Sequence, residues 1–488
     1  MPPTDPFSTP PLSRVTTLDA PVPSGTAKRM ASTALPMGAA PYSAVPKPWT
    51  KNHNPRATVS YYLTWALLFV GAGLGGVQSY FAYTTVRIDR APLCLVFEDE
   101  FNSGDDAAVF GGGGQAGRWL REVQMDGFGN GQFEMTTASS NNSFLLDGKL
   151  YLVPTLTNEG APFVDGTTYN STDCTFNTTA PNAGFDPTTG ECVAFLFDYA
   201  GYYTACSRTT NSTAGTLINP VQSARISTLL SARGSAADEA ANGGKGKGSL
   251  RYGKVEVRAK MPKGDWLWPA IWLLPVNSTY GSWPRSGEID MVESRGNGIR
   301  YTNRGSNYVQ GALNWGPNPA LNAVEKTYSW WTDRRVPFTA GWHTYTLEWT
   351  ESWLRISVDS RLHTLLDIRF NQPFWKRGQF PETTLDANGK AQALKDPWTA
   401  GVPGVNGTGG NAAPFDQDFY LIMNVAVGGT NGWFPDGQGD KPWLNHAGNP
   451  MVDFIKNKAQ WLPTWPEDPK ERGLGVDYVR MWKHCGDP

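Results

Sequence analysis

The segment GEIDMVES, residues 287–294, places three acidic side chains at Glu288, Asp290 and Glu293. Glu288 and Asp290 are two residues apart, which puts them on one face of a β-strand because side chains alternate along a strand. Glu293 is three residues further on and would point to the opposite face of a regular strand. A β-bulge inserts one extra residue and returns such a side chain to the first face. We therefore predict a bulged strand that brings the three carboxyl groups together.

Met291 and Val292 are the predicted bulged pair, and with Ile289 they have the apolar character of the buried side of a sheet. One alternative is a solvated strand edge with scattered acids. Another is a calcium site, which is disfavoured because no Asp- or Asn-rich loop surrounds the segment. Paired carboxyl groups are suited to cleaving a glycosidic bond, since one acid protonates the leaving oxygen while a carboxylate attacks the anomeric carbon or activates water.

The composition of the chain is typical of a large globular protein that is rich in turns. Its 488 residues carry a formal net charge of −2 and include 53 glycines and 20 tryptophans. The near-neutral charge argues against nucleic acid as a partner. Short apolar or alternating runs, separated by Gly, Pro, Asn and Asp, predict many strands and an antiparallel sandwich or barrel. Examples are CLVFEDEF, KLYLVPTL, YGKVEVRAKM, TYTLEWT, LRISVDS, FYLIMNVAV and VDYVRMW.

The N-terminal region has a different character. Residues 1–56 are rich in Pro, Ser, Thr and Ala without apolar periodicity, which predicts a disordered tail. Residues 57–86 contain no charged side chain and are long enough to span a bilayer as one signal-anchor helix. A buried core helix is the alternative. A cleaved signal peptide would be shorter and would lie at the very N-terminus.

The orientation of this helix is predicted by features on its two sides. Basic residues are more frequent before it than after it, which favours a cytoplasmic N-terminus. All N-glycosylation sequons follow the helix: Asn141, Asn170, Asn177, Asn211, Asn277 and Asn406. All cysteines follow it as well: Cys94, Cys174, Cys192, Cys206 and Cys485. We therefore predict a type II membrane protein whose C-terminal part is lumenal or extracellular, in an environment where disulfides persist.

The C-terminal part, residues 91–488, is predicted to form one domain with loop insertions at 158–218 and 234–249. Cys94 and Cys485 bracket this domain and are placed to tie its first strand to its last. Because five is an odd number, at least one thiol is free or pairs with another molecule.

Three segments together resemble glycoside hydrolase family 16, in its laminarinase-like branch of animal endo-1,3-β-glucanases and β-glucan recognition proteins. They are GDWLWPAIWLLP (264–275), WPRSGEIDMVESRGN (283–297) and FYLIMNVAVGGTNGWFPDG (419–437). The resemblance implies an all-β, concanavalin-like β-jelly-roll sandwich with a substrate cleft across its concave sheet. It also implies β-glucan as the partner and requires no cofactor.

The resemblance implies roles for individual residues. Glu288 is similar to the nucleophile of the family, Glu293 to the acid/base and Asp290 to the helper between them. We expect Glu293 to hold the proton while Glu288 stays ionised, because clustered negative charge raises the pKa of one member. The residues implied to bind sugar are Trp268, Trp272, Trp283, Arg225, Asn130, Glu134, Asn314 and Trp315; Glu134 is equally suited to a structural role.

One position departs from the family. Many members have HWG after the acidic strand, whereas this chain has NWG at Asn314 and Trp315. Asparagine donates hydrogen bonds but does not titrate. All five histidines lie elsewhere, so a histidine-based mechanism or a zinc site has no support, and no metal is predicted.

Three functions follow as hypotheses. The first is a membrane-anchored retaining endo-β-1,3-glucanase or glucan transglycosylase that acts on cell-wall or extracellular glucan. The second is a non-catalytic β-glucan-binding protein, since relatives of that kind have lost the acids that this chain keeps. The third is a β-1,6-glucan assembly factor, because fungal type II membrane proteins with related domains resemble this layout.

Overall fold

The computed structural model describes residues 54–112, 115–157, 164–171, 173–176, 198–233, 248–385, 389–399 and 410–486. The chain divides into two compact units, residues 1–88 and 89–488, which are considered separately. Most of the predicted tail, and the sequons at Asn177 and Asn406, lie outside the described residues.

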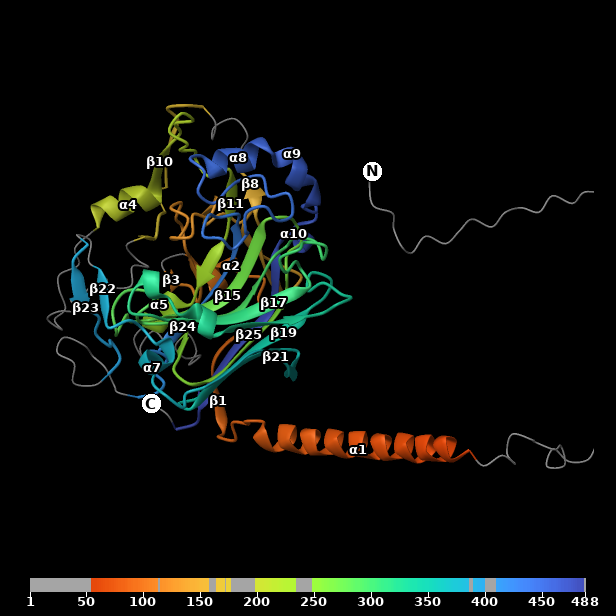
Figure 1. The fold of residues 1–488 in the computed structure, drawn as a ribbon. Coiled ribbons are helices and arrows are strands. Elements are labelled where there is room, and N and C mark those ends of the chain that lie inside the picture. The colour runs from red at the N-terminus through yellow and green to blue at the C-terminus, as the bar shows by residue number, and fades with distance from the viewer. Residues whose placement is uncertain are drawn as a thin grey trace, which may run out of the picture. The chain divides into compact units, whose positions relative to one another are not determined.

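The first unit contains one long helix, α1 (Pro55–Thr85), which closely matches the predicted span (Figure 1). Asn54 caps its N-terminus by accepting a hydrogen bond from the Arg56 N–H, and Pro55 occupies the first turn, where its missing N–H costs nothing. None of its residues is buried. By length and composition, α1 is the one helix of the described chain that is apolar enough to cross a membrane.

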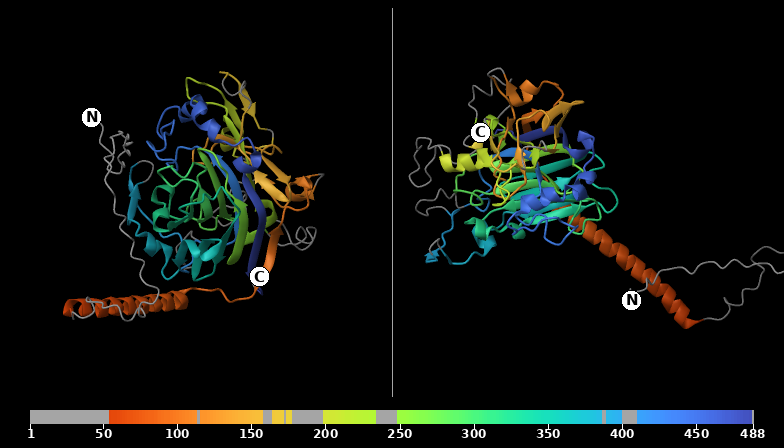
Figure 2. Two further views of the ribbon diagram at one scale, coloured as in Figure 1. Left: turned by 90° about the vertical axis from the view of Figure 1, so that its right-hand side faces the viewer. Right: turned by 90° about the horizontal axis from the view of Figure 1, so that it is seen from above.

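The second unit is built on two eight-stranded antiparallel sheets that lie as two layers (Figure 2). The first sheet has the order β21 (Ser360–Arg369), β20 (Trp353–Val358), β19 (His343–Trp349), β14 (Gly253–Lys260), β25 (Leu474–His484), β7 (Lys149–Leu152), β6 (Ser143–Leu146), with β1 (Leu93–Asp99) also paired to β25. The second has the order β18 (Tyr328–Thr332), β17 (Tyr308–Asn314), β16 (Glu288–Ser294), β15 (Leu267–Pro275), β24 (Phe419–Val427), β12 (Arg225–Ser227), β4 (Leu120–Arg121), with β13 (Ser249–Leu250) also paired to β24. The predicted all-β sandwich is confirmed.

Smaller elements surround the two sheets. The short strands are β5 (Glu134–Thr136), β11 (Val221–Ser223) and β8 (Thr155–Leu156) in one sheet, and the pairs β9 (Thr168–Asn170) with β10 (Ser207–Thr209), β2 (Gly111–Gly112) with β3 (Gln115–Ala116), and β22 (Thr383–Leu385) with β23 (Ala391–Ala393). The helices are α2 (Asp106–Phe110), α4 (Tyr199–Cys206), α5 (Leu229–Arg233), α7 (Phe374–Gly378), α8 (Pro450–Lys456), α9 (Lys458–Trp461), α10 (Pro469–Arg472), η3 (Pro319–Leu321), η4 (Val324–Lys326) and η5 (Leu462–Thr464). β5 and β11 run parallel, unlike the strands of the two large sheets.

The core lies between the two layers. Strand β14 alternates buried and half-buried residues, and Val255, Val257 and Ala259 face inward. Strand β24 is buried along its whole length because it runs through the middle of its sheet, with a neighbour on each side. The inward side chains of β16, Ile289 among them, join the same core. This leaves the other face of the second sheet available for a site.

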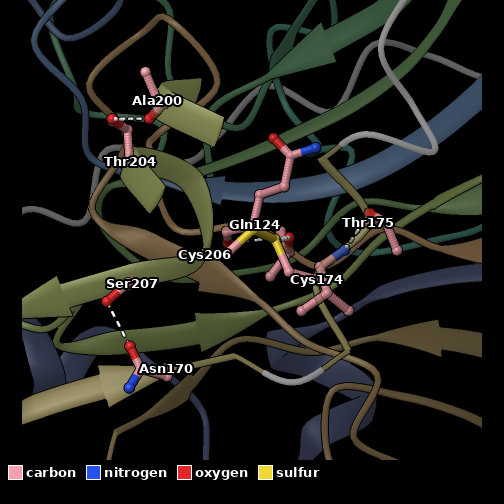
Figure 3. The surroundings of a disulfide bond; sticks show 10 residues. Gln124, Asn170, Cys174, Thr175, Ala200, Thr204, Cys206 and Ser207 are labelled. Carbon is pink, nitrogen blue, oxygen red and sulfur yellow. Dashed lines mark hydrogen bonds between the residues drawn. A yellow bond between two sulfur atoms is a disulfide. The ribbon is translucent and has the colours of Figure 1, made fainter. Parts of the chain in front are cut away.

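Among the described residues of the second unit, two disulfides are present. Cys94 on β1 and Cys485 after β25 are bonded, which confirms that the first strand of the domain is tied to its last. Cys174 is bonded to Cys206 at the end of α4, beside Gln124 (Figure 3). Both cysteines lie within the predicted insertion 158–218, so this bond ties α4 to the segment around Cys174. Cys192 lies outside the described residues.

Candidate active site

A cleft of about 900 Å³ crosses the face of the second sheet that points away from the core. Its floor is made of alternate residues on neighbouring strands: Trp268, Ala270, Trp272 and Leu274 on β15, Glu288, Asp290 and Glu293 on β16, and Gln310, Ala312 and Asn314 on β17. Loops supply the walls, at residues 128–132, 283–287 and 431–433. The period of two along β15 and β17 places the side chains of these two strands on one face.

The three acids share this face because β16 is bulged. Asp290 pairs with Ala312 and Glu293 pairs with Gln310, so two residues of β16 face the single residue Gly311. The same irregularity appears in the pairing of β16 with β15. Both inserted side chains, Met291 and Val292, point into the core. The predicted bulge is therefore confirmed.

Glu288 is held by donors on both carboxylate oxygens. Trp283 Nε1 donates to Oε2 at 3.0 Å and Asn314 Nδ2 donates to Oε1 at 2.8 Å. Burial raises the pKa of Glu288 to about 7, and the charge of Glu293 adds to this effect, while the Trp283 hydrogen bond and the charge of Arg225 oppose it.

Asp290 lies between the other two acids. Asn314 Nδ2, which also donates to Glu288, donates to Asp290 Oδ2 at 2.8 Å. Burial, followed by the charges of Glu288 and Glu293, raises the pKa of Asp290 well above its usual range. A hydrogen bond between the two carboxyl groups raises the pKa of Asp290 and lowers that of Glu288. This hydrogen bond favours the proton on Asp290 and the ionised form of Glu288.

Glu293 accepts hydrogen bonds from Trp268 Nε1 at 3.0 Å and from Gln310 Nε2 at 3.2 Å. Burial raises the pKa of Glu293, and these two donors together with the charge of Arg295 lower it. The sequence-based reasoning named mutual repulsion as the cause of the raised pKa. The first cause is burial, and it raises the pKa of all three acids rather than of one member. That Glu293 holds the proton while Glu288 stays ionised remains a prediction.

Aromatic rings flank the acids. Trp268 stacks on Trp433, with ring centroids 4.7 Å apart and an interplanar angle of 11°, and the guanidinium of Arg295 lies 4.0 Å from the Trp433 ring. Trp283 is 43% exposed and presents an open ring beside Glu288. Trp272 Nε1 donates to Asn424 Oδ1 at 2.8 Å. Trp433 was not predicted as a site residue, although it lies in the third segment that carries the family resemblance.

Arg225 lines the cleft, as predicted, and its position is fixed from two sides. Its Nε lies 2.6 Å from Oε2 of the buried Glu122, and its guanidinium lies 4.2 Å from the Phe128 ring and 4.8 Å from the Trp272 ring. Asn130 also lines the cleft, where its Oδ1 accepts a hydrogen bond from Asn431 Nδ2 at 3.0 Å.

Two residues implied to bind sugar have other positions. Glu134 is 1% exposed and lies behind the cleft wall, where its Oε2 accepts a hydrogen bond from the Val427 N–H at 2.8 Å. Burial raises the pKa of Glu134 to about 8, against the lowering effect of that hydrogen bond. Trp315 is fully buried against Phe374, and its Nε1 donates to Thr327 Oγ1 at 2.7 Å. Neither side chain can contact a sugar in the cleft, so both are corrected to structural residues.

Within the described residues, no group of three or more His, Cys, Asp or Glu side chains is arranged to hold a metal ion. The oxygens of the acidic triad instead receive hydrogen bonds from indole and amide N–H groups. Such an array of donors stabilises carboxylates without a cation.

Comparisons with known proteins identify a matching family model, related sequences and structural neighbours. Residues 219–387 match the profile of glycosyl hydrolases family 16. A beta-1,3-glucan-binding protein of Penaeus monodon is 37% identical over 396 residues, which span 80% of this chain and 90% of that protein. A glucan endo-1,3-beta-glucosidase of Cryptopygus antarcticus is 33% identical over 183 residues, or 38% of this chain and 53% of that protein. The laminarinase from Rhodothermus marinus gives a TM-score of 0.42 at 22% identity, covering 81% of this chain and 99% of that one.

Proposed function

The chain belongs to glycosyl hydrolases family 16, and from that premise we propose that it is a retaining glycoside hydrolase that cleaves β-1,3-glucan within the polymer. The observation that carries the proposal is the set of three acids on one strand face, which line the cleft and accept hydrogen bonds from indole and amide N–H groups. A protein that only binds glucan has no need to desolvate three acids, because each desolvated carboxyl group costs folding free energy.

The proposed mechanism assigns one task to each acid. Glu288, as a carboxylate, attacks the anomeric carbon, and Glu293 protonates the departing glycosidic oxygen, which leaves a covalent glycosyl-enzyme. Glu293 then removes a proton from water, or from a sugar hydroxyl group in a transferase reaction, and the new oxygen displaces Glu288. Asp290 supports the cycle because its hydrogen bond lowers the pKa of Glu288 and keeps the nucleophile ionised.

The cleft is suited to a polysaccharide in its shape and its lining. A volume of about 900 Å³ accommodates several sugar rings, and the cleft lies across a sheet face. The ring of Trp283 beside the acids offers an apolar surface for the C–H face of a sugar, while Asn130 and Asn424 offer polar partners for hydroxyl groups.

The second candidate function is glucan binding without cleavage. It is favoured by the relative from Penaeus monodon, whose name describes binding. The two functions are separated by incubating the purified full-length protein, in detergent, with laminarin, lichenan and pustulan, and then profiling the products by size. Internal cleavage of laminarin that is lost in Glu288→Ala supports the enzyme. Retention of intact laminarin without shorter products supports the binding protein, and cleavage of lichenan alone rules out the β-1,3 specificity.

We further propose that α1 anchors the domain as a type II membrane protein. Residues 57–86 carry no charged side chain, and Tyr61, Trp65 and Tyr80 are placed toward the two ends of the helix, where a bilayer has its interfaces. On the C-terminal side, the described sequon residues are all exposed and so open to glycosylation: Asn141, Asn170, Asn211 and Asn277. The two disulfides on the same side are consistent with the secretory route.

A further inference from the structure

Asn314 Nδ2 donates to Glu288 Oε1 and to Asp290 Oδ2, both at 2.8 Å, so one amide nitrogen joins the two acids. An asparagine side chain can turn over and present its oxygen instead, and that oxygen would repel a carboxylate. The arrangement around the acids therefore requires something that sets the direction of the Asn314 amide.

That direction is set by Asn322, which follows the short helix η3 (Pro319–Leu321). Asn322 Nδ2 donates to Asn314 Oδ1 at 2.7 Å. The backbone N–H groups of Trp315 and Val324 both donate to Asn322 Oδ1, each at 3.2 Å. A backbone N–H can only donate, so these two groups fix the Asn322 oxygen toward themselves and its nitrogen toward Asn314.

The loop between the two asparagines is itself rigid. Trp315 is fully buried and anchors the end of β17 in the core, and the Ala323 N–H donates back to the Trp315 carbonyl at 2.8 Å. A Cβ atom at Gly316 would lie 2.3 Å from the Leu321 carbonyl oxygen, so the loop closes tightly on this glycine. The two amides are therefore held in place by the backbone.

We propose that Asn322 is a positioning residue for the reaction: through Asn314 it fixes an N–H donor against both Glu288 and Asp290 at every pH. This inference rests on the proposed function for its kinetic consequences. The backbone N–H groups of Trp315 and Val324 set the direction of the Asn322 amide, and this amide sets the direction of the Asn314 amide. None of these groups titrates. Glu288 Oε1 and Asp290 Oδ2 therefore keep this N–H donor independently of pH, which favours the ionised form of Glu288.

The direct test is Asn322→Asp. The new carboxylate still accepts from the Trp315 and Val324 N–H groups, but it cannot donate to Asn314. The Asn314 amide then turns its nitrogen toward that carboxylate and its oxygen toward the acids. Loss of hydrogen bonds to charged groups predicts a fall in kcat of about tenfold or more, with KM little changed. The acid limb of the kcat/KM profile is predicted to move to higher pH.

Two further variants separate polarity from charge and from folding. Asn318→Asp adds the same charge in the same turn and keeps its acceptor role for the Leu321 N–H, so it should retain the wild-type profile. Asn322→Leu adds no charge and should move the acid limb of the kcat/KM profile to higher pH by less than Asn322→Asp does. If Asn322→Asp does not fold, Asn322→Leu tests the positioning role in its place. The charged and titratable groups that line the cleft with the two acids are common to all variants: Arg225, Arg233, Glu293, Arg295, Arg304, Glu325, Tyr328 and Tyr420.

A second measurement needs no substrate. In pH-difference infrared spectra of the full-length protein, a protonated carboxyl group has a C=O band that a carboxylate lacks. Both Asn322 variants should keep this band to higher pH than the wild type and Asn318→Asp. Coincident bands and profiles in all four proteins, or an equal shift in Asn318→Asp, would overturn the inference. If the band shifts in the Asn322 variants but the wild-type protein cleaves no glucan, the proposed function is refuted and the positioning role of Asn322 stands.

Discussion

Four carboxyl groups in or behind the cleft have a raised pKa, and desolvation by burial is the first cause in each: Glu134, Glu288, Asp290 and Glu293. The values of about 8 for Glu134 and about 7 for Glu288 lie above the 4.5 of an ordinary glutamate. Between about pH 4.5 and pH 8, the folded protein consequently binds more protons than the unfolded chain. Such a difference makes the free energy of unfolding depend on pH.

The sign of this dependence gives the first prediction. A carboxyl group whose pKa is raised on folding contributes most stability below about pH 4.5, and this contribution is lost as the pH rises to about 8. The Tm measured by calorimetry should therefore fall between pH 5 and pH 8. Glu134→Gln keeps an acceptor for the Val427 N–H and removes the titration, so its Tm should fall less over the same range. A slope equal to that of the wild type would show that Glu134 is not protonated in the folded state.

The second prediction concerns Trp433. Its ring stacks on Trp268, which donates to Glu293, so truncation should remove apolar surface from the cleft and loosen that donor. Trp433→Ala should raise KM for laminarin by about two- to tenfold, the size expected for one aromatic contact of 0.5–1.5 kcal/mol. Trp330→Ala is the matched control, because Trp330 is 41% exposed and does not line the cleft. Equal KM values in the two variants would remove Trp433 from the binding surface.

At the scale of one element, the bulge in β16 decides which side chains reach the cleft. Two residues of β16 face Gly311. On either side of them, each residue of β16 pairs with one residue of β17 in regular register. The bulge is thus an insertion into an otherwise regular strand. Removing one residue of it should restore regular pairing without moving any of the three acids to the other face.

This gives the third prediction. Deleting Met291 leaves Glu288, Asp290 and Glu293 at spacings of two and should retain measurable cleavage of laminarin. Deleting Ile289 instead moves Asp290 out of line with Glu288 and should abolish cleavage. Both side chains are fully buried, so each deletion should lower the free energy of unfolding by a similar amount, about 2–5 kcal/mol. Equal activity in the two deletion variants would refute the assigned role of the bulge.

The same strand shows what could be predicted from the sequence. Spacing alone located the bulge, because side-chain alternation is a local property of a strand. Trp315 was misassigned, and the role of Glu134 was left open between sugar binding and structure, because a motif identifies a segment, whereas burial depends on what packs against it. Trp315 shares its short motif with Asn314, yet consecutive residues of a strand point to opposite faces. The Asn314–Asn322 pair was not predicted either, since its partners are fixed by the fold of a loop.

At the scale of the whole molecule, the features suited to the secretory route all lie in the part of the chain that follows α1. Both disulfides and the exposed sequon residues lie after the helix in the chain. Cys94 and Cys485 are 391 residues apart, so their bond closes nearly the entire second unit into one loop. A disulfide that closes a long loop stabilises the folded state chiefly by restricting the unfolded chain.

The fourth prediction is the membrane topology. With the N-terminus in the cytoplasm, protease added to intact microsomes should remove only the first ~56 residues, because the bilayer protects everything beyond a span of this length. Glycosidase treatment should then increase the mobility of the protected fragment. A protected N-terminus together with a degraded C-terminal domain would contradict the type II orientation.

The central claim is that Glu288 and Glu293 cleave β-1,3-glucan with retention, and the anomer formed first tests it most directly. Proton NMR of laminarin oligosaccharides with the full-length protein should show the β-anomer of the new reducing end before mutarotation, because two successive displacements restore the starting configuration. Glu288→Ala, run beside it, should show no new reducing end. An α-anomer as the first product, or near-normal cleavage by Glu288→Ala, would contradict the account.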